Sequence, residues 1–263
     1  MTHAKAILFG EHSVVYDKYG ISIPLKEMNI SINFENKKID NQIMDENLKY
    51  LYKICNMEKK NIIINSNIPI GKGLGSSAAF AVEFAKAAGI DDIKNIGTLS
   101  EEYIHGKSSG IDLAQVMSDI PLFFNKKEGI RELSFNLNAY LLIIDTGEKG
   151  STKEAVDLVR RNYEINKKYI DKLGEIALLA KENIDDVIKI GELMIEAHFY
   201  LDKIGVANND NNFFVEDALK NNAIGAKLTG GGFGGCNICL FKNKYDALNY
   251  KNKITKPSYL VTI

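Results

Sequence analysis

The chain has 263 residues with a formal net charge of −1, and 45% of its residues are apolar. This length can bury a large core in one domain or in two closely packed lobes. The near-neutral charge gives no field that attracts nucleic acid or a membrane surface, and no apolar stretch is long enough to span a bilayer. We therefore expect a cytoplasmic protein with neither nucleic acid nor a membrane as a partner.

The cysteines indicate neither a disulfide framework nor a zinc site. There are three, Cys55, Cys236 and Cys239, and so small and odd a number suits a reducing compartment. Cys236 and Cys239 form a C-x-x-C pair inside an apolar run that is typical of a strand. No second Cys or His pair is spaced to complete a zinc site, so we expect these two residues to fill a strand.

The N-terminal part of the chain predicts a strand with a charged cluster at its end. Residues 4–10 form an apolar run that carries one lysine, Lys5, and Glu11 and His12 follow it directly. A charged cluster at a strand end is a common place for chemistry in α/β proteins. The next segments predict a half-buried strand, a polar turn, an amphipathic helix and a second strand, over residues 28–35, 37–42, 46–57 and 61–69.

A glycine-rich loop follows the strand that ends at Pro69. Residues 71–75 have glycine at every second position, so the backbone can adopt positive φ and approach a ligand closely. Ser76 and Ser77 then begin an Ala-rich run that predicts a buried helix. A glycine turn before a helix N-terminus makes an anion site, which favours a phosphate chain as the ligand. The same residues also fit a plain loop-to-helix turn, and they match neither the Walker A loop nor the dinucleotide-binding fingerprint.

The middle of the chain predicts helices followed by strands. Residues 91–106 predict short helices with a break near Gly97. The second of these helices carries two carboxylates and a histidine, Glu101, Glu102 and His105. Asp112 lies in the first turn of a helix that begins within residues 107–119. Three strands of an antiparallel meander are expected next, over residues 121–125, 131–136 and 139–147.

The last part of the chain predicts helices and strands around a second glycine cluster, residues 230–235. Amphipathic spacing predicts helices over residues 151–173, 185–205, 215–222 and 245–254. Apolar runs predict strands over residues 223–229, 236–241 and 258–263. Strands first alternate with helices and later segregate from them, which favours an α+β fold with two lobes that meet near residues 140–150.

Three motifs, in this order along the chain, resemble the GHMP small-molecule kinases. They are Lys5 with GEHSVVY, the loop GLGSSAA, and the C-terminal LTGGGFGGC. KAILFGEHSVVY, EEYIHGKSSGID and DTGEKGSTKEAV are similar to the mevalonate kinase branch of that family in particular. The chain departs from this branch at Ser108, where the branch has proline, and in a short segment before Asp112. The resemblance implies a two-lobed GHMP kinase fold, with an N-terminal mixed-sheet lobe (residues 1–145) and a C-terminal ferredoxin-like α/β lobe (residues 146–263).

The same resemblance implies the activity and assigns roles to residues. The implied reaction is phosphorylation of the 5-hydroxyl of mevalonate by ATP with Mg²⁺ as cofactor, and the resemblance allows a homodimer. Asp112 is the implied general base, with Lys5 beside it, and Ser77 and Glu101 are the implied Mg²⁺ ligands. The implied ATP-binding residues are Gly71, Lys72, Gly73, Leu74, Gly75, Ser76, Ser77 and Ala78. The implied acceptor-binding residues are Glu11, His12 (as a hydrogen-bond donor), Asp145, Thr146 and Thr152.

Several of these residues also fit simpler roles. A lysine in an apolar strand is costly unless paired, so Lys5 either pairs with Asp112 or extends to the surface. Asp112 and Thr152 both fit the first turn of a helix for purely structural reasons. The residues alone do not choose between Glu101 and Glu102, whereas the family spacing favours Glu101. Two histidines on helices are expected to be structural, His105 and His198.

Other functions remain open at this point. Within the same fold the alternatives are a phosphomevalonate kinase, a mevalonate 3-kinase and a homoserine kinase. A non-catalytic metabolite sensor on a kinase scaffold is an alternative from a different class. Such a sensor has no need of a complete catalytic set, and the chain retains all four of its members, Lys5, Ser77, Glu101 and Asp112.

Overall fold

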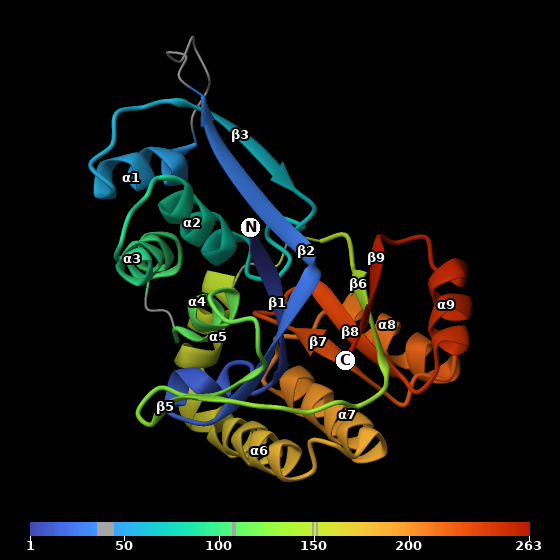
Figure 1. The fold of residues 1–263 in the computed structure, drawn as a ribbon. Helices are drawn as coiled ribbons and strands as arrows, with labels where there is room; N and C mark the ends of the chain where they lie inside the picture. The colour runs from blue at the N-terminus through green and yellow to red at the C-terminus, as the bar shows by residue number, and fades with distance from the viewer. Residues whose placement is uncertain (36–44, 107–108, 149, 151) are drawn as a thin grey trace.

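The computed structural model describes residues 1–35, 45–106, 109–148, 150 and 152–263. Within these residues the chain forms two β-sheets with helices packed against them (Figure 1). The predicted α+β class is confirmed. The polar turn predicted over residues 37–42 and the departure at Ser108 both lie outside the described residues.

The first sheet is organised around one long strand, β2 (Gly20–Glu35), which pairs with β1 (Thr2–Phe9), β3 (Asn61–Ser66) and β4 (Leu122–Asn125). β5 (Gly129–Glu132) pairs with β4 at the edge of the sheet. Every one of these pairings is antiparallel, so the first sheet, expected to be mixed, is antiparallel throughout its described strands. β2 also begins well before the predicted start, because residues 21–25 pair with β1 and are mostly buried there.

Helices gather on one side of the first sheet, and α2 packs directly against β1 and β2 (Figure 1). They are α1 (Glu46–Ile54), α2 (Ser76–Ala87), α3 (Ile93–His105) and α4 (Ile111–Val116). The break predicted near Gly97 is wrong, because α3 runs through this residue without interruption. A Cβ atom built on Gly97 would lie 2.4 Å from Cδ1 of Leu113. The glycine therefore permits close packing of α3 on α4 and does not end a helix.

The second sheet contains the remaining strands in the order β7-β8-β6-β9. Their bounds are β6 (Tyr140–Asp145), β7 (Gly225–Thr229), β8 (Cys236–Phe241) and β9 (Ser258–Thr262). This antiparallel order, with helices between β6 and β7 and between β8 and β9, is the ferredoxin-like arrangement that was expected. The predicted meander of three strands is wrong in its last member, because β6 pairs with β8 and β9 and not with β5.

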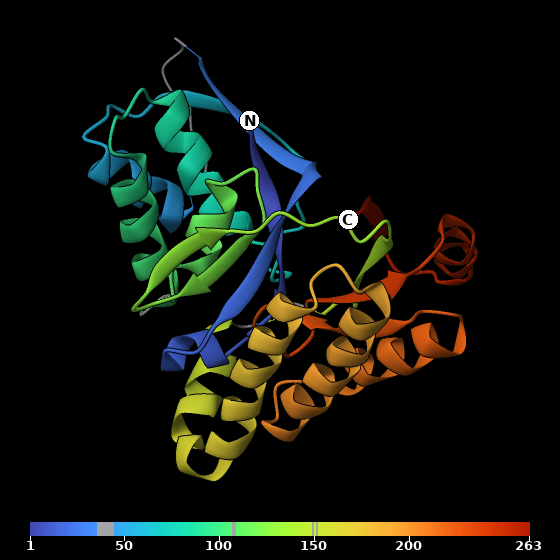
Figure 2. The same ribbon diagram turned by 60° about the horizontal axis from the view of Figure 1, so that its bottom comes forward.

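Helices from the second half of the chain cover the second sheet. The segment predicted as one helix over residues 151–173 forms α5 (Thr152–Arg161) and α6 (Tyr163–Glu182), which meet at Asn162. Figure 2 shows α6, α7 and α8 side by side beneath the strands, and α7 and α8 pack against β7. The remaining helices are α7 (Val187–Lys203), α8 (Asn209–Lys220) and α9 (Lys244–Lys253). No helix among the described residues has the length and apolar character needed to cross a bilayer.

The two cysteines of the C-x-x-C pair fill the second sheet. Cys236 and Cys239 are fully buried in β8, where they join two different apolar clusters. Burial raises the pKa of both thiols, so neither is a reactive thiolate at neutral pH. The described residues contain no group of three or more Cys, His, Asp or Glu side chains that could hold a metal ion. The prediction that these cysteines are structural is confirmed.

Direct contacts join the two sheets along β1 and β7. The backbone N–H of Ile7 donates to Oγ1 of Thr229 (3.0 Å), and the Thr229 hydroxyl donates to the carbonyl of Ile7 (2.9 Å). Next to this contact, a Cβ atom built on Gly230 would lie 2.8 Å from Cα of Gly73. The two glycine clusters therefore pack backbone against backbone. The division into lobes after Asp145 stays a prediction, although β6 already belongs to the second sheet.

The contact between α3 and α4 gives a first testable prediction. Gly97→Ala should lower the free energy of unfolding by about 1–3 kcal/mol, because the added methyl group overlaps the Leu113 side chain. Urea unfolding followed by circular dichroism measures this change. In a Leu113→Ala background the same substitution should cost much less, since the space is then open and alanine favours helix. An equal cost in both backgrounds would show that the overlap is not the cause.

Candidate active site

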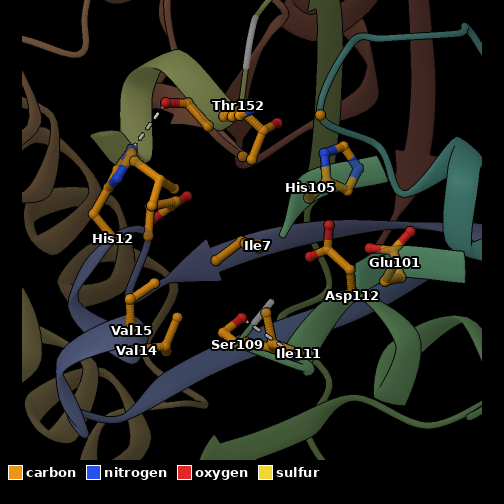
Figure 3. A pocket seen from close by; sticks show the side chains of 16 residues that line it. Ile7, His12, Val14, Val15, Glu101, His105, Ser109, Ile111, Asp112 and Thr152 are labelled. Carbon is orange, nitrogen blue, oxygen red and sulfur yellow. Dashed lines mark hydrogen bonds between the residues drawn. The ribbon is translucent and has the colours of Figure 1, made fainter. Parts of the chain in front are cut away.

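A pocket opens between the first sheet, the helices α3 and α4, and the second glycine cluster. Figure 3 shows His12, Val14 and Val15 on one side, Asp112 and Glu101 on the other, and Ile7 between them. Its lining combines apolar side chains with polar groups from both halves of the chain, including Glu11, Gly73, His105, Ser109, Thr152, Lys153, Gly230 and Gly231. Residues from five separate segments therefore converge on one cavity.

Asp112 lines this pocket and forms an ion pair with Lys5, which is buried behind it. Lys5 lies within β1 and is 1% exposed, and its Nζ lies 2.7 Å from Oδ1 of Asp112. The same Nζ donates to the carbonyl oxygen of Gly73 (3.0 Å). A Cβ atom on Gly75 would lie 2.9 Å from Cγ of Lys5, so glycine is required where the loop passes this side chain. The predicted pairing is confirmed, and the alternative that Lys5 reaches the surface is wrong.

Ser77 and Glu101 lie together beside this pair. The Ser77 hydroxyl donates to Oε1 of Glu101 (2.7 Å) from the first turn of α2. Glu101 is 3% exposed, whereas Glu102 is on the exposed face of α3. Burial, followed by the nearby negative charge of Asp112, raises the pKa of Glu101 to about 7. Nearby positive charge therefore does not offset the cost of burying the Glu101 carboxylate.

His105 was expected to be structural, yet the structure places it in the pocket wall. His105 is the last residue of α3, and its Nε2 lies 3.3 Å from Oγ of Ser77. Burial lowers its pKa, and Lys5 adds to this effect against the opposing pull of Asp112. The ring is thus favoured in its neutral form next to Ser77. Its position one turn after Glu101 on the same helix was the signal that could have placed it there.

The glycine loop leads directly into α2, as predicted. Gly75 is the N-cap in a left-handed conformation (φ 74°), and no side chain caps the helix. The Ser76 and Ser77 hydroxyls therefore do not cap α2, and the Ser77 hydroxyl instead points to Glu101. Uncapped N–H groups at a helix start favour an anionic ligand. The loop thus has the form of the predicted phosphate site.

Lys72, which the family resemblance implies as an ATP-binding residue, forms an ion pair in this structure. Its Nζ pairs with Oδ1 of Asp145 at 2.7 Å and donates to the carbonyl of Glu148 at 2.9 Å. Both side chains of the ion pair are largely buried. The lysine thereby links the glycine loop to the end of β6. A direct contact of Lys72 with ATP stays a prediction, and in this structure its charge is already neutralised.

His12 lies at the left of the pocket in a conformation with φ 61°. Its Nε2 lies 2.8 Å from the carbonyl oxygen of Gly231, which can only accept, so this nitrogen carries the proton. Burial lowers the pKa of His12 to about 4, and the ring is neutral. The expectation that His12 donates to the acceptor stays a prediction, and in this structure its N–H is engaged by the carbonyl of Gly231. Nδ1 can still meet a ligand, but as a hydrogen-bond acceptor.

Glu11 forms a second buried ion pair, with Lys227 of β7. Both side chains are fully buried, and Lys227 Nζ donates to Oε1 of Glu11 and to the carbonyl of Leu228 (2.6 Å). Lys227 was not among the site residues predicted from the sequence. Its signal was available, because Lys227 is a lysine in an apolar strand, as Lys5 is.

Comparison with known proteins places this geometry in a family. Residues 42–119 match the sequence profile of the GHMP kinases N terminal domain, and residues 176–259 match that of the GHMP kinases C terminal domain. The chain is 32% identical to a mevalonate kinase of Pyrococcus abyssi over 98% of this chain and 93% of the relative. This chain belongs to the GHMP kinase family. A mevalonate kinase of Pyrococcus furiosus is 34% identical to this GHMP kinase over 92% of this chain and 88% of the relative.

Solved structures of GHMP kinases have the same fold. The mevalonate kinase of Methanococcus jannaschii superposes with a TM-score of 0.79 at 25% identity, over 100% of this chain and 97% of that one. The L. major mevalonate kinase, solved in complex with R-mevalonate, superposes with a TM-score of 0.82 at 22% identity, over 99% and 94% of the two chains. The predicted two-lobed GHMP kinase fold is confirmed.

The remaining predicted residues of this GHMP kinase divide into two groups. Thr152 lines the pocket at the start of α5, and Lys153 beside it lines the pocket as well. Asp145 is engaged by Lys72, and the buried Thr146 hydroxyl donates to the carbonyl of Gly235 (3.0 Å). Neither of these two residues belongs to the pocket lining, so their contact with the acceptor stays a prediction.

The raised pKa of Glu101 gives a second prediction, measured without added metal. Protonation of Glu101 is favoured in the folded state up to about pH 7, whereas the unfolded chain loses this proton near pH 4.5. Stability should therefore fall as the pH rises between these values. Glu101→Gln removes this cost and should be more stable than wild type at pH 8, by up to about 3 kcal/mol. The difference should shrink at pH 5, as measured by urea unfolding.

Glu102→Gln is the matched control for this experiment. Glu102 is the next residue on the same helix and is exposed, so its substitution should change stability little at either pH. A Glu101→Gln variant whose advantage does not depend on pH would contradict the assignment of a raised pKa.

Proposed function

We propose that this GHMP kinase transfers the γ-phosphoryl group of ATP to the 5-hydroxyl of mevalonate. The observation that carries the proposal is the Asp112 carboxylate, which is held by buried Lys5 in a pocket that begins at the glycine loop. A base, an anion-binding loop and an enclosed cavity are the parts that phosphoryl transfer to an alcohol requires. Mevalonate is chosen because curated relatives above 30% identity, which span about nine-tenths of both chains, are mevalonate kinases.

The phosphate chain of ATP is assigned to the loop and the start of α2. Residues 71–75 and the first turn of α2 offer backbone N–H groups and the positive end of the helix dipole. The second glycine cluster packs against this loop, so Gly73 and Gly230 both reach the pocket lining. Preorganised N–H groups of this kind stabilise charge that develops on a transferred phosphoryl group.

Asp112 is assigned as the base that accepts the proton of the attacking hydroxyl. Its side chain is about one-third exposed, so it is open to the pocket on one side and held by Lys5 on the other. The ammonium group of Lys5 also lies close to the place where negative charge develops on the alcohol oxygen. The pair therefore combines proton transfer with electrostatic stabilisation.

Mg²⁺ is assigned to the oxygen atoms of Ser77 and Glu101. Mg²⁺ is usually held by one or two carboxylates together with substrate phosphates, and it keeps several waters, so two protein oxygens suffice. The buried Glu101 carboxylate fits a cation because its burial is not compensated by a positive partner. When bound, Mg²⁺ would bridge and neutralise phosphate oxygens.

The sensor alternative requires no catalytic pair, whereas Lys5 and Asp112 are in contact and Ser77 and Glu101 lie beside them. This arrangement favours an enzyme. The cytoplasmic location and the homodimer stay predictions.

The third prediction tests the reaction and its base together. Wild-type protein should release ADP with mevalonate, and far less with phosphomevalonate, homoserine or galactose, in a coupled assay. Asp112→Asn should reduce kcat by about 10²–10⁴-fold while ATP still binds. Lys5→Met should also reduce kcat, and the double variant should be little worse than the worse single variant. Near-normal turnover by folded Asp112→Asn would refute the base assignment.

The fourth prediction tests the metal. Glu101→Gln should lose most of kcat and raise the Mg²⁺ concentration needed for half-maximal rate by about tenfold or more. Glu102→Gln, the exposed neighbour, should behave like wild type. Equal effects from the two substitutions would remove Glu101 from the metal site.

A further inference from the structure

In the second buried ion pair, between Glu11 and Lys227, only one of the two carboxylate oxygens of Glu11 is hydrogen-bonded among the described residues. Lys227 occupies Oε1 of Glu11, while Oε2 is buried and has no hydrogen-bond partner among the described residues. Glu11 itself lines the pocket. An unpaired oxygen on a buried carboxylate costs free energy, and such atoms in native structures call for an explanation.

Stability alone does not explain this pair. Taking two charges out of water costs several kcal/mol per ion, and apolar residues of similar volume often replace such pairs without loss. The pair also spans the two sheets, because Glu11 follows β1 and Lys227 lies in the middle of β7. Burial raises the pKa of Glu11 and lowers the pKa of Lys227, and each charge offsets part of the other's shift. Lys227 is thus what favours the charged form of Glu11.

Among the titratable groups around Glu11, Lys227 has the largest effect on the ionisation of its carboxyl. Lys5 also favours the charged form of Glu11, but its ammonium group is engaged by Asp112. His12, the next residue, is neutral. Glu101, His105 and Lys153 line the same pocket from α3 and α5, and within the described part of the chain none of them forms a hydrogen bond or ion pair with Glu11.

Behind Lys227, a chain of hydrogen bonds fixes the strand. The backbone N–H of Leu228 donates to Nδ1 of His198 (3.4 Å), and His198 Nε2 lies 3.0 Å from Oδ1 of Asn212. Asn212 in turn donates to Asp202 (2.8 Å). Burial lowers the pKa of His198 to about 4, so this histidine is neutral and adds no charge next to Lys227.

We propose that Lys227 is a positioning residue for the acceptor: it holds Glu11 ionised and oriented so that Oε2 accepts a hydrogen bond from an acceptor hydroxyl. This inference rests on the proposed function, in which the acceptor is an alcohol. A charged Glu11 favours a neutral hydroxyl at this place and disfavours an anionic group there, because like charges repel at close range. Lys227 thereby contributes to acceptor choice without contact with the acceptor.

The fifth prediction compares the pH dependence of KM for mevalonate in four proteins: wild type, Lys227→Met, Glu11→Gln and the double variant. Without Lys227, the Glu11 carboxyl loses its ion-pair partner, so burial should raise its pKa further than in wild type. In Lys227→Met, KM should be raised about tenfold or more at neutral pH and should recover toward the wild-type value as the pH rises and the Glu11 carboxyl ionises. In wild type, KM should change much less with pH between neutral and alkaline conditions, because Lys227 offsets part of the effect of burial.

The Glu11→Gln background separates positioning from packing. This variant should have a raised KM at every pH, because the amide cannot become a carboxylate. Adding Lys227→Met to it should change KM little, since the lysine then has no charge to hold. Additive effects in the double variant, or a raised KM in Lys227→Met that does not recover at high pH, would overturn the proposal.

Thr229→Val is the matched control. Thr229 lies two residues from Lys227 on β7 and bonds the backbone of β1, but it does not touch Glu11. This variant should lose stability and keep a KM that is flat with pH. A pH-dependent KM in Thr229→Val would mean that any damage to β7 has the same effect, which would also overturn the proposal.

A measurement on the wild-type protein keeps this inference separate from the proposed function and from the folding of the variants. The Glu11 carboxyl carbon can be followed by ¹³C NMR in protein labelled at glutamate Cδ, with Glu11→Gln to assign the signal. Glu11 should be ionised at neutral pH in wild type, and should be protonated there in Lys227→Met or Lys227→Gln. A protonated Glu11 in wild type overturns the inference even if mevalonate is turned over. An enzyme inactive on mevalonate, with the expected titrations, refutes only the proposed function.

Discussion

The geometry of the site depends on the cost of burying the Lys5 ammonium group. A cation inside a strand must be matched by a negative charge, and Asp112 supplies it from the first turn of α4. The Lys5 side chain crosses the space above Gly75, so the glycine loop is drawn against the same pair. The base, the cation and the phosphate loop are thereby fixed relative to one another by one ion pair and the glycine that admits it.

A second buried lysine is also neutralised by a carboxylate, and this ion pair connects the two sheets. Lys227 lies in β7 of the second sheet and is neutralised by Glu11, which follows β1 of the first. Lys72 makes a third link, from the glycine loop to Asp145 at the end of β6. Each charge in these three ion pairs is therefore held by a partner on a different element, and two of the charges, Glu11 and Asp112, reach the pocket lining. Such an arrangement keeps the polar groups of the site in place.

The local motifs of the site could be predicted from the sequence, whereas the residues that contact them in space could not. Lys5, Asp112 and the glycine loop were predictable because each is a local departure from its surroundings: a cation in an apolar strand, an acid at a helix start, a run of glycine. Contacts over long sequence separations were not. The donor of His12 is used by the carbonyl of Gly231, and β6 leaves the predicted meander to join β8. These outcomes depend on which segments meet in space, and no local pattern encodes that.

The backbone contact between the two glycine clusters has a consequence for the history of the chain. Gly73 and Gly230 are more than 150 positions apart, yet a side chain on either one would occupy the same narrow gap. The residues at these two positions therefore cannot change independently. A larger side chain at one position fits only if the backbone of the other segment moves away. A chimaera that joined the first lobe of this protein to the second lobe of a relative would inherit the fold of both. It would form an intact pocket only if the backbones of the two glycine clusters still packed closely against each other.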